Sequence, residues 1–194
     1  MRILAAAAEL FAELGYARTT LAKIAEAAGV SIETVQLHGP KGALMIAAGE
    51  YVAVGVSGEE DVFNLELGRH LLAVEDRDQA LDYVVAAQAE IHRRNAAIIW
   101  AMMGAAAIDP ELDRYLGDLM ASINRQIHRV LSLFRDRGWL REDVPFDELV
   151  ETAAVVCSDD TYLRVTRRDG WTEARYERWC RRLLAEGLFS KAVP

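Results

Sequence analysis

Polar and basic side chains near the amino terminus are suited to hydrogen bonding with a polyanion. Arg18 and Lys41 are cations that suit phosphate, and Glu33, Thr34 and Gln36 are polar groups that could reach the edges of bases. The Glu33 carboxylate would repel phosphate, although it could accept a hydrogen bond from the N4 amino group of cytosine. Such groups could contact a polyanion only if the elements around them bring them to one surface.

Short helices are expected to position these groups. Between Ile3 and Leu14, apolar residues recur at steps of three and four, which is typical of an amphipathic helix. We expect Gly15 to end that helix in the left-handed conformation. A second short helix is predicted after the pair Thr19-Thr20, either of which could cap its free amides.

The tight turn Ala28-Gly29-Val30-Ser31 joins this second helix to a third, which we predict over about residues 32–37. Gly29 supplies the backbone freedom for the turn, and Ser31 caps the third helix. Two short helices joined in this way, over about residues 19–38, indicate a helix-turn-helix. In such a pair the second helix enters the major groove.

Helical periodicity continues through the rest of the chain, and we predict no strand, so the fold class is all-α. Asp109-Pro110-Glu111 is a helix start, with a capping carboxylate, proline at the first position and an acid in the first turn. The further predicted helices cover about residues 41–54, 64–74, 78–104, 110–138, 145–167 and 172–188.

Charge is distributed unevenly along the 194 residues, which carry a formal net charge of −8. Residues 1–50 hold four cations and five anions, a net of −1, whereas the remainder holds 18 and 25, a net of −7. Net charge alone argues against a nucleic-acid partner. If either part binds a polyanion, however, the asymmetry favours the first.

The amino-terminal pattern resembles the DNA-binding domain of tetracycline-repressor (TetR) family regulators. The residues that carry the resemblance are Leu10-Phe11-Ala12-Glu13-Leu14-Gly15-Tyr16, Thr19-Thr20, Ile24-Ala25, Ala28-Gly29-Val30-Ser31, Thr34-Val35, Lys41 and Ala43-Leu44. The tail from Gly170 to Trp179 is similar to the last helix of many members. Between Gln36 and Lys41 the sequence departs from the family pattern, because it lacks two usual aromatic residues and is one residue shorter.

The resemblance implies that the start of the second helix and Lys41 hold the DNA backbone. The residues predicted to contact DNA are Arg18, Thr20, Ser31, Ile32, Glu33, Thr34, Gln36, His38 and Lys41. It also implies a DNA-binding domain over residues 1–43 and a helical effector-binding and dimerisation domain over 44–194. Trp100, Met103 and Tyr162 could line an effector cavity, although such residues at helical spacing are more often ordinary core.

Dimerisation is expected through the last two long helices, which the resemblance pairs with their symmetry mates. The final helix carries an apolar stripe broad enough to need a partner. Its members are Tyr176, Trp179, Cys180, Leu183, Leu184 and Leu188.

The sequence contains no recognisable motif for catalysis or for metal binding. It contains no G-x-S-x-G, Walker or H-E-x-x-H pattern, so we expect neither an enzyme nor a cofactor. His70, His92 and His128 are scattered, which favours solvated or hydrogen-bonded histidines over a metal site. Cys157 and Cys180 are too few for a disulfide framework and are expected to be packed thiols in a cytoplasmic protein.

The sequence therefore predicts a homodimeric, ligand-responsive transcriptional regulator. It would be a repressor that a small molecule releases from a pseudopalindromic operator. The alternative is a helical small-molecule binding module that has lost specific DNA binding, which the acidic charge and the shortened segment before Lys41 motivate.

Overall fold

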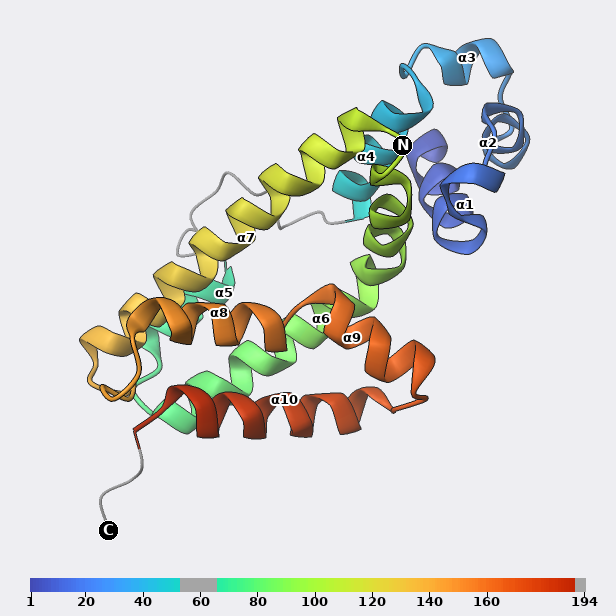
Figure 1. Ribbon diagram of the computed structural model, residues 1–194. Helices are drawn as coiled ribbons and strands as arrows, with labels where there is room; N and C mark the ends of the chain where they lie inside the picture. Colours follow the sequence, from blue (N-terminus) through green and yellow to red (C-terminus); the bar gives the residue numbers. More distant parts are fainter. Residues whose placement is uncertain (53–65, 191–194) are drawn as a thin grey trace. The chain divides into compact units, whose positions relative to one another are not determined.

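Helices make up nearly all of the computed structural model, which describes residues 1–52 and 66–190 (Figure 1). The described part of the chain contains no strand, only an isolated antiparallel bridge between Leu140 and Phe189. The prediction of an all-α fold is confirmed. The elements are α1 (Arg2–Arg18), α2 (Leu21–Ala28), α3 (Ile32–Gln36), α4 (Lys41–Val52), α5 (Glu66–Ala73), α6 (Arg77–Ala106), α7 (Pro110–Asp136), α8 (Phe146–Val156), α9 (Asp159–Leu163), the π-helix η2 (Arg164–Arg168) and α10 (Glu173–Leu188).

Two compact units divide the chain. The first comprises Met1–Ser57 and Arg94–Met120, and the second comprises Gly58–Arg93 and Ala121–Pro194. The long helices α6 and α7 therefore each contribute one part to each unit. The functional boundary predicted after residue 43 is a different kind of division, and it stays a prediction. Among the described residues, no helix is both long and apolar enough to cross a membrane.

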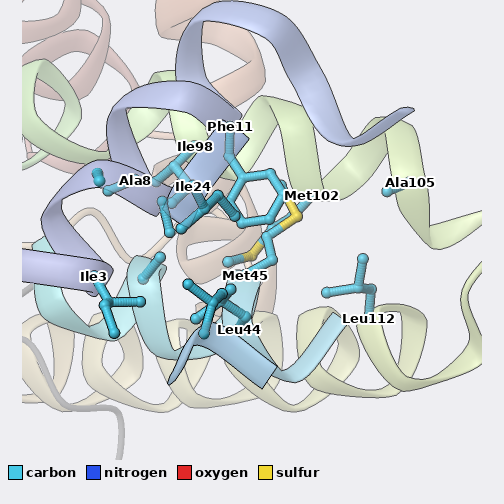
Figure 2. Packing of buried hydrophobic residues seen from close by; sticks show 14 of the residues in the cluster. Ile3, Ala8, Phe11, Ile24, Leu44, Met45, Ile98, Met102, Ala105 and Leu112 are labelled. Atoms are coloured by element: carbon cyan, nitrogen blue, oxygen red, sulfur yellow. The ribbon is translucent and has the colours of Figure 1, made fainter. Parts of the chain in front are cut away.

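The core of the first unit is shared by its short amino-terminal helices and by later parts of the chain. Phe11 of α1, Ile24 of α2 and Met45 of α4 are fully buried together with Met102 of α6 and Leu112 of α7 (Figure 2). Three short helices bury too little apolar surface to be stable alone. The α2–α3 pair is therefore supported by a core that it shares with α4, α6 and α7.

The glycine predicted to end the first helix interrupts it, but in a different conformation. The assigned helix α1 runs on to Arg18, and Gly15 lies within it at φ 74° and ψ 173°. The expected left-handed conformation is therefore wrong, since a ψ near 173° belongs to a region that only glycine occupies readily. The interruption is real, and it turns Tyr16 and the residues after it out of the line of the helix.

The single helix predicted over residues 145–167 is also wrong, because the chain breaks after Cys157. Ser158 is extended, with ψ 153°, and its hydroxyl accepts a hydrogen bond from the Thr161 amide, which starts α9. The apolar period continues through this segment, so only the cap marks the break. Of the helix predicted over residues 64–74, positions 64 and 65 lie outside the described residues, as do positions 53 and 54 of the helix predicted over 41–54.

In the second unit, most of the apolar stripe on α10 is covered by the chain itself. Tyr176, Cys180, Leu184 and Leu188 are all buried, and α10 packs against α8. The width of the stripe therefore no longer argues for a partner helix. Dimerisation stays a prediction.

Candidate nucleic-acid interface

The amino-terminal end of α2 gathers cations and a capping hydroxyl. The Thr20 side chain accepts a hydrogen bond from the Lys23 amide at 3.2 Å, as the sequence predicts for one of the two threonines. The Lys23 ammonium donates to the Arg18 carbonyl at 3.0 Å, and the Arg18 Nε atom donates to the Leu14 carbonyl at 2.9 Å. Exposed cations beside a helix amino terminus suit a phosphate group.

The neighbouring threonine holds the interruption in α1 rather than capping α2. Thr19 is fully buried, and its hydroxyl lies 3.0 Å from the Leu10 carbonyl and 2.9 Å from the Gly15 carbonyl. Carbonyl groups near a helix end need such partners when they are removed from water. Thr19 thus fixes the angle at which the chain enters α2.

Helix α3 is anchored by one residue and exposes the others. Val35 is fully buried, whereas 42% of Ile32 and 86% of Leu37 are exposed. The Ser31 hydroxyl caps the helix by accepting a hydrogen bond from the Thr34 amide at 3.3 Å. The predicted contact residues that are exposed to solvent are Arg18, Thr20, Ser31, Ile32, Glu33, Thr34, Gln36 and His38.

The carboxylate of Glu33 is engaged at the amino terminus of its own helix. Its pKa is lowered, first by a hydrogen bond from its own backbone amide and second by one from the Ser31 hydroxyl. The carboxylate is therefore ionised near neutral pH and lies where a helix dipole favours an anion. A DNA phosphate approaching α3 would meet this negative charge.

Lys41 differs from the other predicted contacts because it is half-buried and already bound. Its ammonium donates to the Tyr16 carbonyl at 2.8 Å and to the Thr19 carbonyl at 3.2 Å, and it lies 4.0 Å from the centre of the Tyr16 ring. An ammonium group has three N–H donors. One donor therefore remains for a phosphate oxygen, and its direction is fixed by the other two.

Sequence reasoning missed the role of Tyr16, whose hydroxyl donates a hydrogen bond to Asp109 Oδ2 at 2.5 Å. Burial and the nearby Asp109 carboxylate raise the pKa of Tyr16 well above its usual value. The same hydrogen bond is the main cause that lowers the pKa of Asp109, with further contributions from the Leu112 and Glu111 amides and from Lys41. The last turn of α1, just before α2, is thereby tied to the start of α7.

Asp109 also performs the capping role that the sequence predicts. Its Oδ1 atom accepts hydrogen bonds from the Glu111 amide at 3.1 Å and the Leu112 amide at 3.4 Å. A Cβ atom on Gly42 of α4 would lie 2.8 Å from Asp109 Oδ2, so the small residue allows this close approach. The sequence signals the cap but not the contact with Tyr16, which is 93 positions away.

The residues predicted to line an effector cavity lie in different units. Trp100 is 44% exposed, and Met103 is half-buried against the core of the first unit. Tyr162 is buried in the second unit, where its ring lies 5.1 Å from both His92 and Tyr176, measured between ring centres. Their role as a ligand site stays a prediction.

Sequence reasoning also missed a buried polar network in the second unit. His92 Nδ1 lies 2.8 Å from Asp159 Oδ1, and His92 Nε2 lies 2.9 Å from the Cys157 carbonyl. The ring is nearly inaccessible to water, and Gln88 Nε2 also lies 3.1 Å from His92 Nε2, so the polar partners of the ring come from the protein. Within the described residues, no three His, Cys, Asp or Glu side chains are grouped closely enough to hold a metal ion.

A family model matches the segment that contains this candidate interface. Residues 3–38 match the model described as bacterial regulatory proteins, tetR family. The match includes all of α1, α2 and α3 except Arg2, and it includes the helix-turn-helix predicted over residues 19–38. No curated protein matches the chain.

Solved structures share the fold over nearly the whole chain. A putative transcriptional regulator from Saccharomonospora viridis in complex with choline is 16% identical, with a TM-score of 0.76, and the match covers 98% of this chain and 97% of that one. The TetR family transcriptional regulator PfmR from Thermus thermophilus is 23% identical, with a TM-score of 0.70 and coverage of 95% and 97%. The fatty acid degradation regulator FadR from Bacillus halodurans is 16% identical, with a TM-score of 0.73 and coverage of 95% and 93%.

Proposed function

We propose that this chain is a TetR-family transcriptional regulator, a repressor that a small molecule releases from DNA. The observation that carries the proposal is the α2–α3 pair, which lies within the family match and exposes its polar residues while Val35 anchors it. Such a pair places its second helix in the major groove.

Backbone contacts and base contacts fall to different residues in this proposal. Phosphates are held by Arg18, by the amino terminus of α2 and by the remaining donor of Lys41. Base edges are reached by Thr34 and Gln36, which lie on the exposed side of α3. Tyr16 and Asp109 do not touch DNA. They fix the carbonyl groups that orient Lys41, and they tie the α2–α3 pair to α7.

A symmetric dimer supplies the second copy of α3, the helix proposed to enter the major groove. It would place two copies of α3 about 34–36 Å apart, one for each half of a pseudopalindromic operator. Two copies of Arg18 and Lys41, with Lys23 as a third cation, would neutralise roughly four to six phosphates, so log K would fall with log salt at a slope of about −4 to −5.

Release requires an effector that binds one state of the dimer more tightly than another. The coupling between effector and operator then equals the difference in effector affinity between the two states. Structures of the same fold from other organisms include one solved with choline and one named for fatty acid degradation, so we propose a small organic effector for this chain as well. Trp100, Met103 and Tyr162 remain the candidate contacts.

A second candidate function is a helical small-molecule binding module without specific DNA binding. The ionised Glu33 at the amino terminus of α3 favours it, as does the net charge of −8. Both oppose the approach of a polyanion.

Fluorescence anisotropy with labelled DNA from the region upstream of the protein's own gene separates the two functions. At about 50 mM salt we expect saturable binding that weakens steeply by about 200 mM salt and exceeds binding to a shuffled sequence. Lys41→Ala should weaken it, whereas Arg168→Ala, an exposed cation of the second unit, should not. Absence of any preference over the shuffled DNA, together with tight binding of a small molecule, would establish the second function instead.

A further inference from the structure

The two cysteines of the chain lie side by side in the second unit, although 23 residues separate them. Cys157 is the residue that ends α8, Cys180 lies in α10, and their Sγ atoms are 3.8 Å apart. Cys180 is fully buried and Cys157 is half-buried. Neither thiol has a part in the proposed contacts with DNA or effector.

The backbone around Cys157 is held in place by hydrogen bonds at the end of α8. The Cys157 amide donates to the Ala153 carbonyl at 2.9 Å, and the Cys157 carbonyl lies 2.9 Å from His92 Nε2. The next residue, Ser158, is extended, so the thiol stands at a helix end rather than in its interior. A disulfide needs an S–S distance of about 2.05 Å, so the two sulfur atoms must approach each other for the bond to form.

The two sulfur atoms are also chemically unequal. A hydrogen bond with the Cys157 thiol lowers the pKa of Cys180. The same contact with Cys180, together with burial, raises the pKa of Cys157. Cys180 is therefore the sulfur that ionises first, and the thiolate is the reactive form.

A buried hydroxyl beside the pair has no partner. Tyr176 lies one turn before Cys180 on α10 and is fully buried, and its hydroxyl makes no hydrogen bond of normal geometry. Buried polar atoms are almost always paired. A hydroperoxide oxygen next to Cys180 would provide the missing partner.

We propose that Cys157 and Cys180 form a redox-active dithiol that a hydroperoxide converts to an intramolecular disulfide between the end of α8 and α10. The Cys180 thiolate attacks one peroxide oxygen, so that an S–O bond forms, the O–O bond breaks and the departing oxide is protonated. The Cys157 sulfur then attacks the resulting sulfenic acid, an S–S bond forms, and the hydroxyl leaves as water with the thiol proton. Two thiols and one hydroperoxide thus give one disulfide, one alcohol and one water, or two waters from hydrogen peroxide.

Treatment of the native protein with one equivalent of hydrogen peroxide tests the proposal directly. We expect the intact mass of the monomer to fall by two hydrogens, both thiols to disappear in a thiol titration, and dithiothreitol to reverse both changes. A non-reduced tryptic digest should contain one cross-linked pair of peptides, one with Cys157 and the other with Cys180. Cys157→Ser and Cys180→Ser should lose the two-hydrogen change and keep one oxidisable thiol.

Equilibrium with glutathione gives a second measurement that needs no variant. A disulfide that fits the folded unit should withstand at least roughly tenfold more reduced glutathione in native protein than in urea-unfolded protein. Thiols that stay reduced, a disulfide only between chains, oxidation to sulfinic acid without a cross-link, or equal resistance in folded and unfolded protein would each overturn the proposal. Far-UV circular dichroism before and after peroxide confirms that the reaction took place in the folded state.

Discussion

Replacing Tyr16 with phenylalanine should lower the free energy of unfolding by about 1–2 kcal/mol at neutral pH. The variant removes only the hydroxyl that donates to Asp109 Oδ2 at 2.5 Å, since the ring stays against Phe11 and under Lys41. A hydrogen bond to a charged group contributes about 1.5–3 kcal/mol, and Asp109 is only half-buried, so water can replace part of the loss. The expected value therefore lies around and slightly below the lower end of that range.

The pH dependence of this difference follows from the two pKa shifts. The pKa of Asp109 is lowered, so its contribution is fully present above the ordinary carboxyl value of 3.8 and is lost as the pH falls through the lowered value. The pKa of Tyr16 is raised, so its contribution is present below the ordinary value of 10.0 and is lost as the pH rises through the raised value. The gap between wild type and variant should thus be constant from about pH 5 to about pH 9 and shrink toward more acidic pH.

Urea unfolding followed by far-UV circular dichroism measures the gap, and a double-mutant cycle isolates the pair. Asp109→Asn and the double variant complete the cycle with Tyr16→Phe. We expect a coupling energy of about 1 kcal/mol or more at neutral pH. Strictly additive losses, or a gap that does not change between neutral pH and about pH 3, would refute the interpretation that this hydrogen bond holds the end of α1 in front of α2.

Three further predictions concern DNA affinity and the interruption of α1. Glu33→Gln should strengthen binding to random DNA by about 0.5–1 kcal/mol per half-site in anisotropy titrations at low salt, because it removes a charge that repels phosphate, and unchanged or weaker binding to random DNA would contradict this repulsion. Lys41→Ala should weaken binding to all sequences and reduce the salt slope of a dimer by about 2. Gln36→Ala should instead change the base preference at one position of the operator. Equal losses of affinity on operator and random DNA for Gln36→Ala would contradict a base contact by Gln36. Gly15→Ala should lower the free energy of unfolding in urea by about 1–3 kcal/mol, because only glycine adopts the φ and ψ of this position readily. The control, Gly104→Ala within α6, should leave the free energy of unfolding unchanged or raise it, because a Cβ atom there meets nothing within 4 Å.

Local signals in the sequence predict the helices and their caps well. Thr20 and Ser31 each cap the helix that the sequence assigns to them, because a capping hydrogen bond spans only three positions. The turn at Gly29 is predictable for the same reason, since the glycine adopts the left-handed conformation with φ 64° and ψ 42°.

Long-range contacts escape the same reasoning. Nothing near Tyr16 indicates Asp109, and nothing near His92 indicates Asp159, because these pairs form only when separate helices pack. The break at Ser158 is missed for a different reason: the apolar period passes through it, and a serine cap in a continuous pattern is a weak signal.

The candidate interface likewise contains one feature that the sequence predicts and one that it does not. Exposure of Gln36 and Thr34 follows from the helical period around the buried Val35, so the outward face of α3 is predictable. The half-buried state of Lys41 is not, because it depends on the Tyr16 and Thr19 carbonyls that the interruption at Gly15 turns toward it.

Glu33 sets a condition on how a regulator with this reading helix would search a genome. Because its carboxylate occupies the amino terminus of α3, random duplex offers little to offset the repulsion, and encounters with it would be brief. Only a half-site whose cytosine amino group receives that carboxylate would convert the same charge from an obstacle into a contact. Short dwell times on wrong sequences and a long one on the right sequence would then come from a single side chain.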